Sequence, residues 1–326
     1  MVGRIRIHDL DTLPTPLRPQ LAAFGASDGD PPQDFGLIGR IKRLGHPASD
    51  YYAVYAVEND QVLSRVETLQ LRFHGFEGAQ TVVGISDVLT RPDGLGRGFA
   101  KALLREVHRR ESARGRDWSF LWTHRSWGAH RLYESLGYED VYSPPIALRE
   151  SPRRAPRSLP AGYRWTTAGV RDEGRLERLF DAATRGRLGF VPRSRGFPRV
   201  RFRLGWRKPE NHRILTFGRQ AVGYANLSDL SSWNVSTNEV VVTLPEHLEP
   251  MVLGLEALAR GRWLTFQVTS FVRDAEKVLA TRGYAVYPTS HFVLMAKRLR
   301  SKPSRGEDLR GVFRSSRFSS HRGDMF

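Results

Sequence analysis

The first part of the chain carries the patterns of apolar positions that are typical of strands. Residues 51–57 read Tyr-Tyr-Ala-Val-Tyr-Ala-Val, and apolar side chains fall on alternate positions within residues 61–76. The Asn59-Asp60 pair between these two segments predicts a tight turn, and therefore a β-hairpin. Residues 81–89 (TVVGISDVL) form a nearly continuous apolar run, which is typical of a central strand buried on both faces.

Helical spacing follows this run. The apolar residues Phe99, Ala102, Leu103 and Val107 fall at helical spacing, which predicts an amphipathic helix. A further strand over residues 118–123 and a short helix over 128–136, closed by Gly137, come next. With a short strand at 5–7 and a helix within 13–24 at the start, this order predicts a mixed α/β domain.

A second block repeats the same order of elements. Leu136-Gly-Tyr138 near the end of the first block also resembles Arg282-Gly-Tyr284 near the end of the second. The sequence therefore predicts an internal duplication. The elements expected in the second block are a helix at 176–183, a hairpin at 214–227, a strand at 238–244, a helix at 251–259, a strand at 263–268, a helix at 274–281 and a strand at 291–296.

Composition divides the chain into four parts. We expect a first domain over residues 1–145 and a second over 163–299. Residues 146–162 are rich in proline and arginine and lack periodicity, which predicts a linker. Residues 300–326 consist mainly of serine, arginine and glycine, which predicts a disordered basic tail.

Overall composition excludes several classes of protein. The 326 residues are 40% hydrophobic, which is enough for packed cores and excludes global disorder. We find no apolar run long enough to span a membrane and no signal-peptide pattern. The chain has no cysteine, which excludes a disulfide scaffold and thiol catalysis and leads us to expect a cytoplasmic protein. The ten histidines show no ligand spacing, so we predict no metal site.

The charge is strongly positive, at +17, and 45 of the 51 cations are arginine. One interpretation is a polyanionic partner such as a nucleic acid, and the other is a GC-rich genome that encodes arginine in place of lysine. Residues 193–213 interleave arginines with Phe197, Phe202 and Trp206, a pattern that suits stacked single-stranded bases. The same pattern is equally that of a segment whose aromatics pack inward while its arginines face water.

Glycines lie between the buried strand at 81–89 and the helix that follows. Gly94, Gly96 and Gly98 permit a tight turn that points successive backbone N–H groups, and the positive end of the helix, at one spot. A pyrophosphate suits such a spot, and Arg97 and Lys101 would add positive charge around it. The segment lacks the GxxxxGK[ST] of a P-loop and follows too many strands for a Rossmann site. The alternative is a turn without a ligand.

Two motifs resemble the GNAT N-acetyltransferase superfamily. Gly98-Phe-Ala100 matches the second half of [Q/R]-x-x-G-x-[G/A], although Leu95 stands at the Gln/Arg position, and we expect Arg97 to replace the missing side chain. The pattern A-x-x-L-Y-x-x-x-G-[F/Y] is matched by Ala129, Leu132, Tyr133, Gly137 and Tyr138. The resemblance implies an α/β fold of two tandem GNAT-like acyltransferase domains. The first would be catalytic and the second degenerate, because residues 244–250 carry prolines and glutamates where glycines are needed.

The resemblance also implies acetyl-CoA as cofactor and direct transfer of its acetyl group to a primary amine of a protein or small molecule. Tyr133 would protonate the leaving thiolate, with core packing as its alternative role. Asp87 would be the base, although it could instead cap a turn, and His124 is a similar candidate. The expected cofactor-binding residues are Val88, Leu89, Thr90, Leu95, Gly96, Arg97, Gly98, Phe99, Ala100 and Lys101.

Two other functions remain open from the sequence. One is a nucleic-acid- or ribosome-associated binding protein that uses the acetyltransferase fold as a scaffold, with contacts through the basic surface and tail. The other is a module that binds coenzyme A without turnover. An amine-bearing substrate is the expected partner of the enzyme, and no membrane contact is expected.

Overall fold

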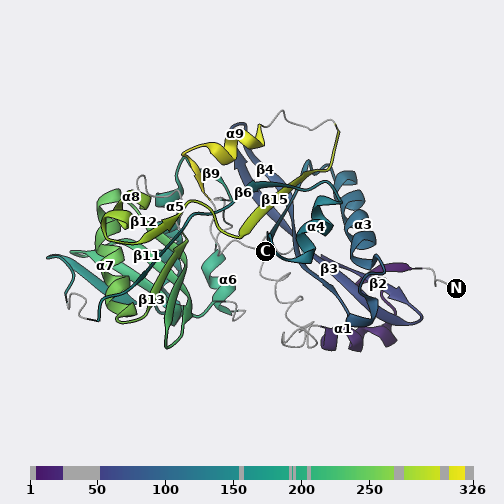
Figure 1. Ribbon diagram of the computed structural model, residues 1–326, viewed down its shortest axis with the longest axis horizontal. Coiled ribbons are helices and arrows are strands. Elements are labelled where there is room, and N and C mark those ends of the chain that lie inside the picture. Colours follow the sequence, from purple (N-terminus) through teal and green to yellow (C-terminus); the bar gives the residue numbers. More distant parts are fainter. Residues whose placement is uncertain are drawn as a thin grey trace.

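The computed structural model has two mixed sheets that lie side by side, each covered by helices (Figure 1). Strands far apart in the sequence meet in both sheets. The two sheets confirm the mixed α/β architecture and the duplication predicted from the sequence. The structure describes residues 5–24, 52–153, 158–190, 193, 196–203, 207–267, 275–301 and 308–319.

The first sheet has the order β1-β2-β3-β4-β5-β15-β6. Strands β4 and β5 run parallel, and the other neighbours on this path are antiparallel. Asn59 and Asp60 join β2 to β3 with φ angles of 48° and 56°, the left-handed turn that their sequence predicted. The strands are β1 (Arg6–Asp9), β2 (Tyr52–Glu58), β3 (Gln61–Gly75), β4 (Gly78–Thr90), β5 (Trp118–His124), β6 (Glu139–Tyr142) and β15 (Phe292–Arg298).

Helices cover both faces of this sheet. Helices α3 (Phe99–Ala113) and α4 (Gly128–Glu134) share one hydrophobic cluster with alternate residues of β2, β4, β5 and β15. Helix α1 (Arg18–Phe24), with the 3-10 turn Thr15–Leu17 before it, lies on the opposite face and shares a cluster with Tyr55 and Val57 of β2. The two faces therefore carry separate cores, and alternation along each strand assigns a side chain to one or the other.

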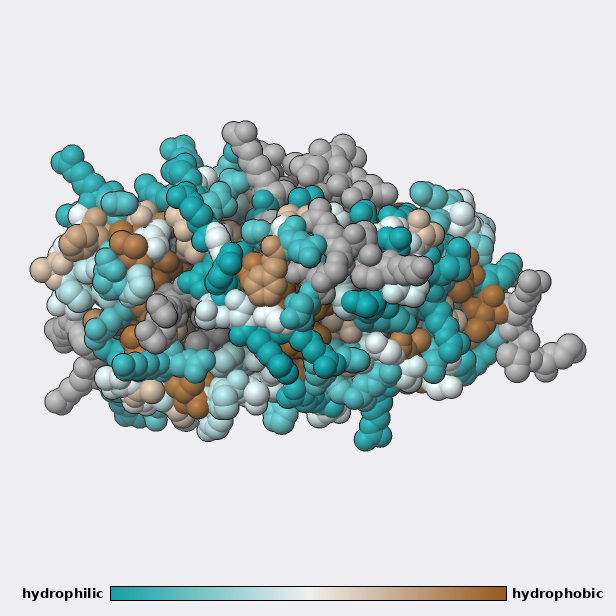
Figure 2. All heavy atoms as spheres, turned by 90° about the horizontal axis from the view of Figure 1, so that it is seen from above, coloured by the Kyte–Doolittle hydropathy of each residue, from teal (hydrophilic) through white to brown (hydrophobic). Residues whose placement is uncertain are grey.

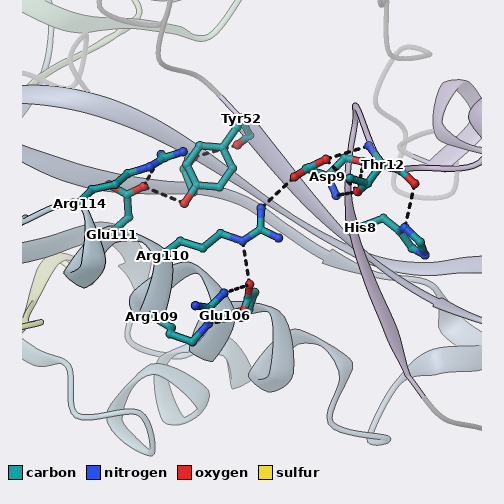
Figure 3. Close-up of polar contacts among 10 residues, drawn as sticks. His8, Asp9, Thr12, Tyr52, Glu106, Arg109, Arg110, Glu111 and Arg114 are labelled. Atoms are coloured by element: carbon teal, nitrogen blue, oxygen red, sulfur yellow. Dashed lines mark hydrogen bonds and ion pairs between the residues drawn. The ribbon is translucent and has the colours of Figure 1, made fainter.

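Polar contacts fix α3 to the edge of the sheet. Arg110 of α3 lies between Asp9 of β1, at 3.1 Å, and Glu106 of its own helix, at 2.8 Å (Figure 3). Hydrogen bonds from the Arg109 and Arg110 guanidiniums hold the pKa of Glu106 at about 2, below its ordinary value, so the carboxylate stays charged at neutral pH. The orientation of α3 matters because its N-terminus follows the glycine loop.

The second sheet has the order β14-β7-β13-β12-β11-β10-β8. Its hydrophobic cluster includes residues of helices α5, α7 and α8. Six of the seven elements predicted for the second block have counterparts here, whereas the strand predicted at 291–296 is β15 of the first sheet. Strands β8 and β14 and helix α6 were not predicted. The elements are β8 (Tyr163–Thr167), α5 (Glu173–Thr184), α6 (Phe197–Arg203), β10 (His212–Phe217), β11 (Gln220–Leu230), β12 (Asn234–Val242), α7 (Leu248–Ala259), β13 (Trp263–Gln267), α8 (Ala275–Thr281) and β14 (Ala285–Tyr287).

The two halves exchange a strand. Strand β7 (Ile146–Glu150) leaves the first half and lies between β13 and β14 of the second sheet. In return, β15 leaves the second half and lies between β5 and β6 of the first sheet. The predicted linker 146–162 is therefore wrong at its start, and the second domain does not simply end at residue 299. Flanking prolines and arginines masked a short strand whose Ala147 is fully buried.

The C-terminal residues also differ from the prediction. Residues 308–319 form α9 (Leu309–Arg314) and β16 (Phe318–Ser319), and β16 pairs with β9 (Leu188–Gly189), which contacts β3. Phe313 and Phe318 are buried against the first sheet with Phe73 and Phe120. The predicted disordered tail is wrong for these residues because four apolar side chains between the arginines supply a small core. Residues 302–307 and 320–326 lie outside the described residues.

Hydrophilic side chains dominate the molecular face in Figure 2, and hydrophobic ones form small separate groups on it. None of the helices in the described ranges is both long enough and apolar enough to cross a membrane.

Candidate active site

The glycine loop joins the end of β4 to α3. A 3-10 turn over Pro92–Gly94 follows β4, and α3 begins at Phe99. Gly96 and Gly98 have φ angles of 73° and 83°, a left-handed conformation that side chains rarely adopt. A Cβ at either position would meet no atom within 4 Å. Glycine is therefore required by the backbone conformation and not by a lack of space for a side chain.

Five backbone N–H groups of this segment are available. Leu95 donates to the carbonyl of Pro92 at 3.3 Å, and Arg97 donates to that of Gly94 at 3.4 Å. Among the described residues, we find no acceptor for the other N–H groups of the loop and the first helical turn. These belong to Gly96, Gly98, Phe99, Ala100 and Lys101.

Among the described residues, therefore, no backbone carbonyl or side chain accepts a hydrogen bond from these five amides. Unpaired N–H groups at the start of a 15-residue helix form an anion site, because the helix dipole adds to their partial charges. The segment is therefore able to hold a diphosphate.

The side chain of Arg97 pairs with a carboxylate of the first sheet. Its guanidinium forms an ion pair with Glu58, the last residue of β2, and lies 4.9 Å from the ring centre of Phe99. The Glu58 side chain is only 5% exposed, so the pair is anchored in the protein interior. Arg97 thus ties the loop to the sheet, whereas Lys101 remains at the helix start and Leu95 is exposed.

Strands β4 and β5 separate beside the loop. Their parallel pairing ends at Ile85 opposite Leu121, although β4 continues to Thr90 and β5 to His124. Beyond Ile85, two residues of β4, Asp87 and Val88, oppose one residue of β3, which is a β-bulge. The bulge gives Asp87 a φ of 41°. The predicted residues Val88, Leu89 and Thr90 therefore line the diverging part of β4.

Asp87 lies on the sheet face opposite α3. Its carboxylate is 3.3 Å from the guanidinium of Arg65, and half of the side chain is exposed. Arg65 is nearly buried and lies opposite Tyr55 in the β2–β3 register, on the face that α1 covers. Glu67, also nearly buried, is 3.7 Å from Arg65. The predicted base is thus a partly exposed carboxylate that lies beyond the last paired residues of β4 and β5.

Tyr133 of α4 lies in the core on the other face. It is 6% exposed and belongs to the same cluster as Ile85, Phe99 and Leu121. Burial raises the pKa of Tyr133 to about 12, so the phenol keeps its proton at neutral pH. Burial is the one cause of this shift, and we find no hydrogen bond of the hydroxyl to another described residue. A protonated hydroxyl beside the diverging strands is able to donate a proton.

His124 ends β5 and is committed to local contacts. Its Nδ1 accepts hydrogen bonds from the N–H and the hydroxyl of Ser126, at 3.2 and 2.7 Å. Its ring stacks on Trp127 and on His291. These contacts indicate that His124 has a structural role in the site. Asp87 is therefore the stronger candidate for the base.

Sequence reasoning missed several residues of this region. Glu58 lies on β2 and Arg65 on β3, whereas Trp127 and His291 directly precede α4 and β15, and none of the four belongs to a motif. The one available signal was charge within β strands, because a buried strand rarely carries Glu58 or Arg65 without a partner.

The second sheet keeps the layout of the site but not its amides. Pairing of β12 with β13 ends at Thr237 opposite Phe266, and the β11–β12 register shifts around Asn238. The following segment, however, reads Leu-Pro-Glu-His-Leu-Glu-Pro, and its Pro245 and Pro250 have no N–H to donate. Such a segment is poorly suited to a diphosphate.

Two arginines of the segment 193–213 are nearly buried. Arg193 and Arg207 form ion pairs with Glu239 of β12 at 2.6 and 3.2 Å, and the side chains of both are less than 10% exposed. Arg193 also stacks on Phe180 of α5, with its guanidinium carbon 3.5 Å from the ring centre. These two arginines therefore fasten the segment to the second sheet and do not face a solvent-borne polyanion. Trp206 lies outside the described residues.

Comparison with known proteins agrees with this geometry. Residues 15–141 match the family model of the acetyltransferase (GNAT) domain. No curated protein matches the chain.

Solved structures share the fold along most of the chain. A probable N-acyltransferase from Enterococcus faecalis V583 is 13% identical with a TM-score of 0.66, over 91% of this chain and 73% of that one. Eis1 from Mycobacterium abscessus is 15% identical with a TM-score of 0.59, over 91% and 74%. A tandem GNAT protein from the clavulanic acid biosynthesis pathway is 14% identical with a TM-score of 0.54, over 92% and 100%. At these identities the likeness shows the fold.

Proposed function

We propose that the chain is a tandem GNAT protein whose first domain transfers an acetyl group from acetyl-CoA to a primary amine of a protein or small molecule. The match of residues 15–141 to the GNAT domain model and the fold shared with a tandem GNAT protein support this proposal. Five N–H groups at the start of α3 carry this proposal, because they have no acceptor in the part of the chain that the structure describes and lie next to the separation of β4 from β5. They supply hydrogen-bond donors where a diphosphate needs them. The absence of cysteine also suits a cytoplasmic enzyme.

The residues present fit coenzyme A. The amides of Gly96 and of Gly98 to Lys101 would hold its diphosphate, and Val88 to Thr90, on the separated part of β4, would line its pantetheine arm. When bound, acetyl-CoA supplies an acetyl thioester whose C–S bond breaks as the C–N bond to the amine forms. The protein then has to manage two protons, one on the amine and one for the departing sulfur.

Tyr133 would supply the proton for the sulfur. Its raised pKa of about 12 keeps the hydroxyl protonated over the whole range in which the enzyme would work. The surrounding apolar side chains exclude water, so that the thiolate would find this hydroxyl as its donor.

Asp87 would accept the proton from the amine, directly or through water. It lies on the opposite face of the sheet from Tyr133, so the two groups approach the separated strands from different sides. An amine in water is mostly protonated, and a partly exposed carboxylate both attracts the ammonium and accepts its proton.

The second domain would serve the first as scaffold. Its own loop lacks the glycines, and its strand β15 completes the first sheet. We propose that it binds no coenzyme A.

Calorimetric titration of acetyl-CoA into a pair of glycine variants tests the proposal. Gly98 and Gly115 lie before and after α3, both have φ near 80°, and a Cβ at either would meet nothing within 4 Å. Gly98→Glu and Gly115→Glu therefore impose the same backbone strain, but only the first sets a carboxylate beside the amides. Gly98→Glu should abolish binding and Gly115→Glu should keep it. Equal affinity in the two variants would exclude the site.

A further inference from the structure

Four aromatic rings gather where β5 ends. The rings of His291, His124 and Trp127 stack in sequence, with centroid separations of 5.1 and 5.6 Å and interplanar angles of 27° and 28°. Phe292 meets His124 and Trp127 edge-on at 5.2 and 5.8 Å. We call these four residues the aromatic platform.

The platform is built from both halves of the chain. His124 and Trp127 belong to the first half, whereas His291 and Phe292 enter it at the start of the exchanged strand β15. The N–H of Arg125 donates to the carbonyl of His291, and that of Trp127 donates to His124, both at 2.9 Å. The backbone thus holds the rings in place before any ligand arrives.

The outer ring of the platform faces solvent. Trp127 is 54% exposed, and His124 covers one side of its ring. An indole fixed from one side and exposed on the other offers a flat surface to a second ring, because stacked aromatic pairs gain energy beyond the area that they bury.

The platform lies on the same sheet face as Asp87. Leu121 faces α3 and α4, so by alternation the side chain of His124 points to the opposite face, as Phe120 does. Asp87 contacts Arg65 on that face as well. Both lie beyond the last paired residues of β4 and β5, Asp87 on one strand and His124 on the other. A carboxylate and an aromatic surface therefore border the same opening.

We propose that the acceptor is a primary amine that carries a flat aromatic ring, with the ring on the aromatic platform and the amino group toward Asp87. This inference rests on the proposed acetyl transfer and names its substrate class. The carboxylate complements the ammonium form of the amine, although the chain as a whole is strongly basic. The second half of the chain thereby takes part in selecting the substrate of the first.

Steady-state kinetics with two amines test the platform. Phenethylamine and n-hexylamine both present a primary amine on an alkyl chain, and only phenethylamine has a ring. Trp127→Ala and His291→Ala should raise the KM for phenethylamine about tenfold and change that for n-hexylamine less than about twofold. Trp233→Ala, which removes a 65% exposed indole from the second domain, is the matched control and should change neither.

The outcomes separate the inference from the proposed function. An equal rise in KM for both amines, or a weaker Kd for acetyl-CoA in Trp127→Ala, would overturn the inference, since the platform would then be structural or would bind the coenzyme. If the wild type acetylates neither amine, the proposed transfer fails for both. Calorimetric titration of phenethylamine into wild type and Trp127→Ala then tests ring binding at the platform without acetyl transfer. Equal affinity would reject it, and a Kd about tenfold weaker in the variant would retain it as a ring-binding site.

Discussion

The hydroxyl of Ser143 accepts a hydrogen bond from the N–H of Ser290 at 2.9 Å and donates to the carbonyl of the same residue at 2.9 Å. Ser143 precedes β7 and Ser290 precedes β15, so the two serines meet where the exchanged strands cross. Each half of the chain thus completes the sheet of the other. Folding of the two domains should be a single event, since neither sheet has its full set of strands without the other half.

The exchange predicts that the halves do not fold alone. A fragment of residues 1–162 lacks β15, and its strands β5 and β6 would leave their backbone groups without partners in the middle of a sheet. We expect both this fragment and residues 163–326 to show poorly dispersed amide NMR spectra. Mixed and refolded together, they should recover the spectrum of the intact chain. A well-dispersed spectrum from either fragment by itself would contradict the exchange.

The ion pair between Arg97 and Glu58 predicts a role in coenzyme binding that the motif does not reveal. Glu58→Gln removes the charge that holds Arg97, so the loop should lose its fixed position and the Kd for acetyl-CoA should rise several-fold. The pair fixes the loop and takes no part in the proton transfers assigned to Tyr133 and Asp87. The kcat at saturating acetyl-CoA should therefore change little.

Asp60→Asn is a suitable control for that variant. Asp60 also pairs with an arginine, Arg6 at 2.8 Å, but both side chains are largely exposed. Exposed pairs contribute little, so this variant should bind acetyl-CoA as the wild type does. An unchanged Kd in Glu58→Gln, measured beside it, would show that the loop holds its shape without Arg97.

Local sequence patterns predicted most of the helices and strands. They did not predict which strands pair across the chain. The turn at Asn59-Asp60 and the left-handed glycines at 96 and 98 follow from what those residues allow. By contrast, β7 and β15 have similar apolar patterns that fit the middle of either sheet, so periodicity identifies strands without their partners.

The polar part of the site escaped prediction for the same reason. Glu58 and Arg97 are 39 residues apart on different elements, and nothing local connects them. Asp87 adopts a left-handed φ without being glycine, because the register of β3 and β4 forces the bulge. Such features depend on how strands meet, which a single sequence does not state.

Tyr133 should control turnover and leave binding unchanged. Tyr133→Phe removes only the hydroxyl, so kcat should fall by about 10²-fold while the Kd for acetyl-CoA stays within about twofold. Because the raised pKa keeps the phenol protonated up to about 12, the wild type should show no loss of kcat from this group between pH 7 and 10.

Tyr138→Phe separates catalysis from packing. The Tyr138 hydroxyl bonds to Ser119 at 2.6 Å and to His108 at 2.9 Å, so its loss should lower the free energy of unfolding by about 1 kcal/mol with little effect on kcat. If Tyr133→Phe behaved as Tyr138→Phe does, Tyr133 would be a core residue and not the acid.

His108 predicts a specific dependence of stability on pH. Burial lowers the pKa of His108 to about 3, whereas a histidine in the unfolded chain titrates near 6.5. The unfolded state therefore takes up a proton as the pH falls below 6.5, and the folded state does not until about pH 3. The stability that the neutral ring provides is complete above pH 6.5 and declines toward pH 3, by at most about 1.4 kcal/mol per pH unit.

Urea unfolding of wild type and His108→Gln at pH 7, 6 and 5 measures this slope. In the variant, the slope should correspond to the uptake of about one proton fewer on unfolding. His212, whose pKa burial lowers to about 4, should account for part of the remainder. Identical slopes in the two proteins would mean that His108 is charged in the folded state.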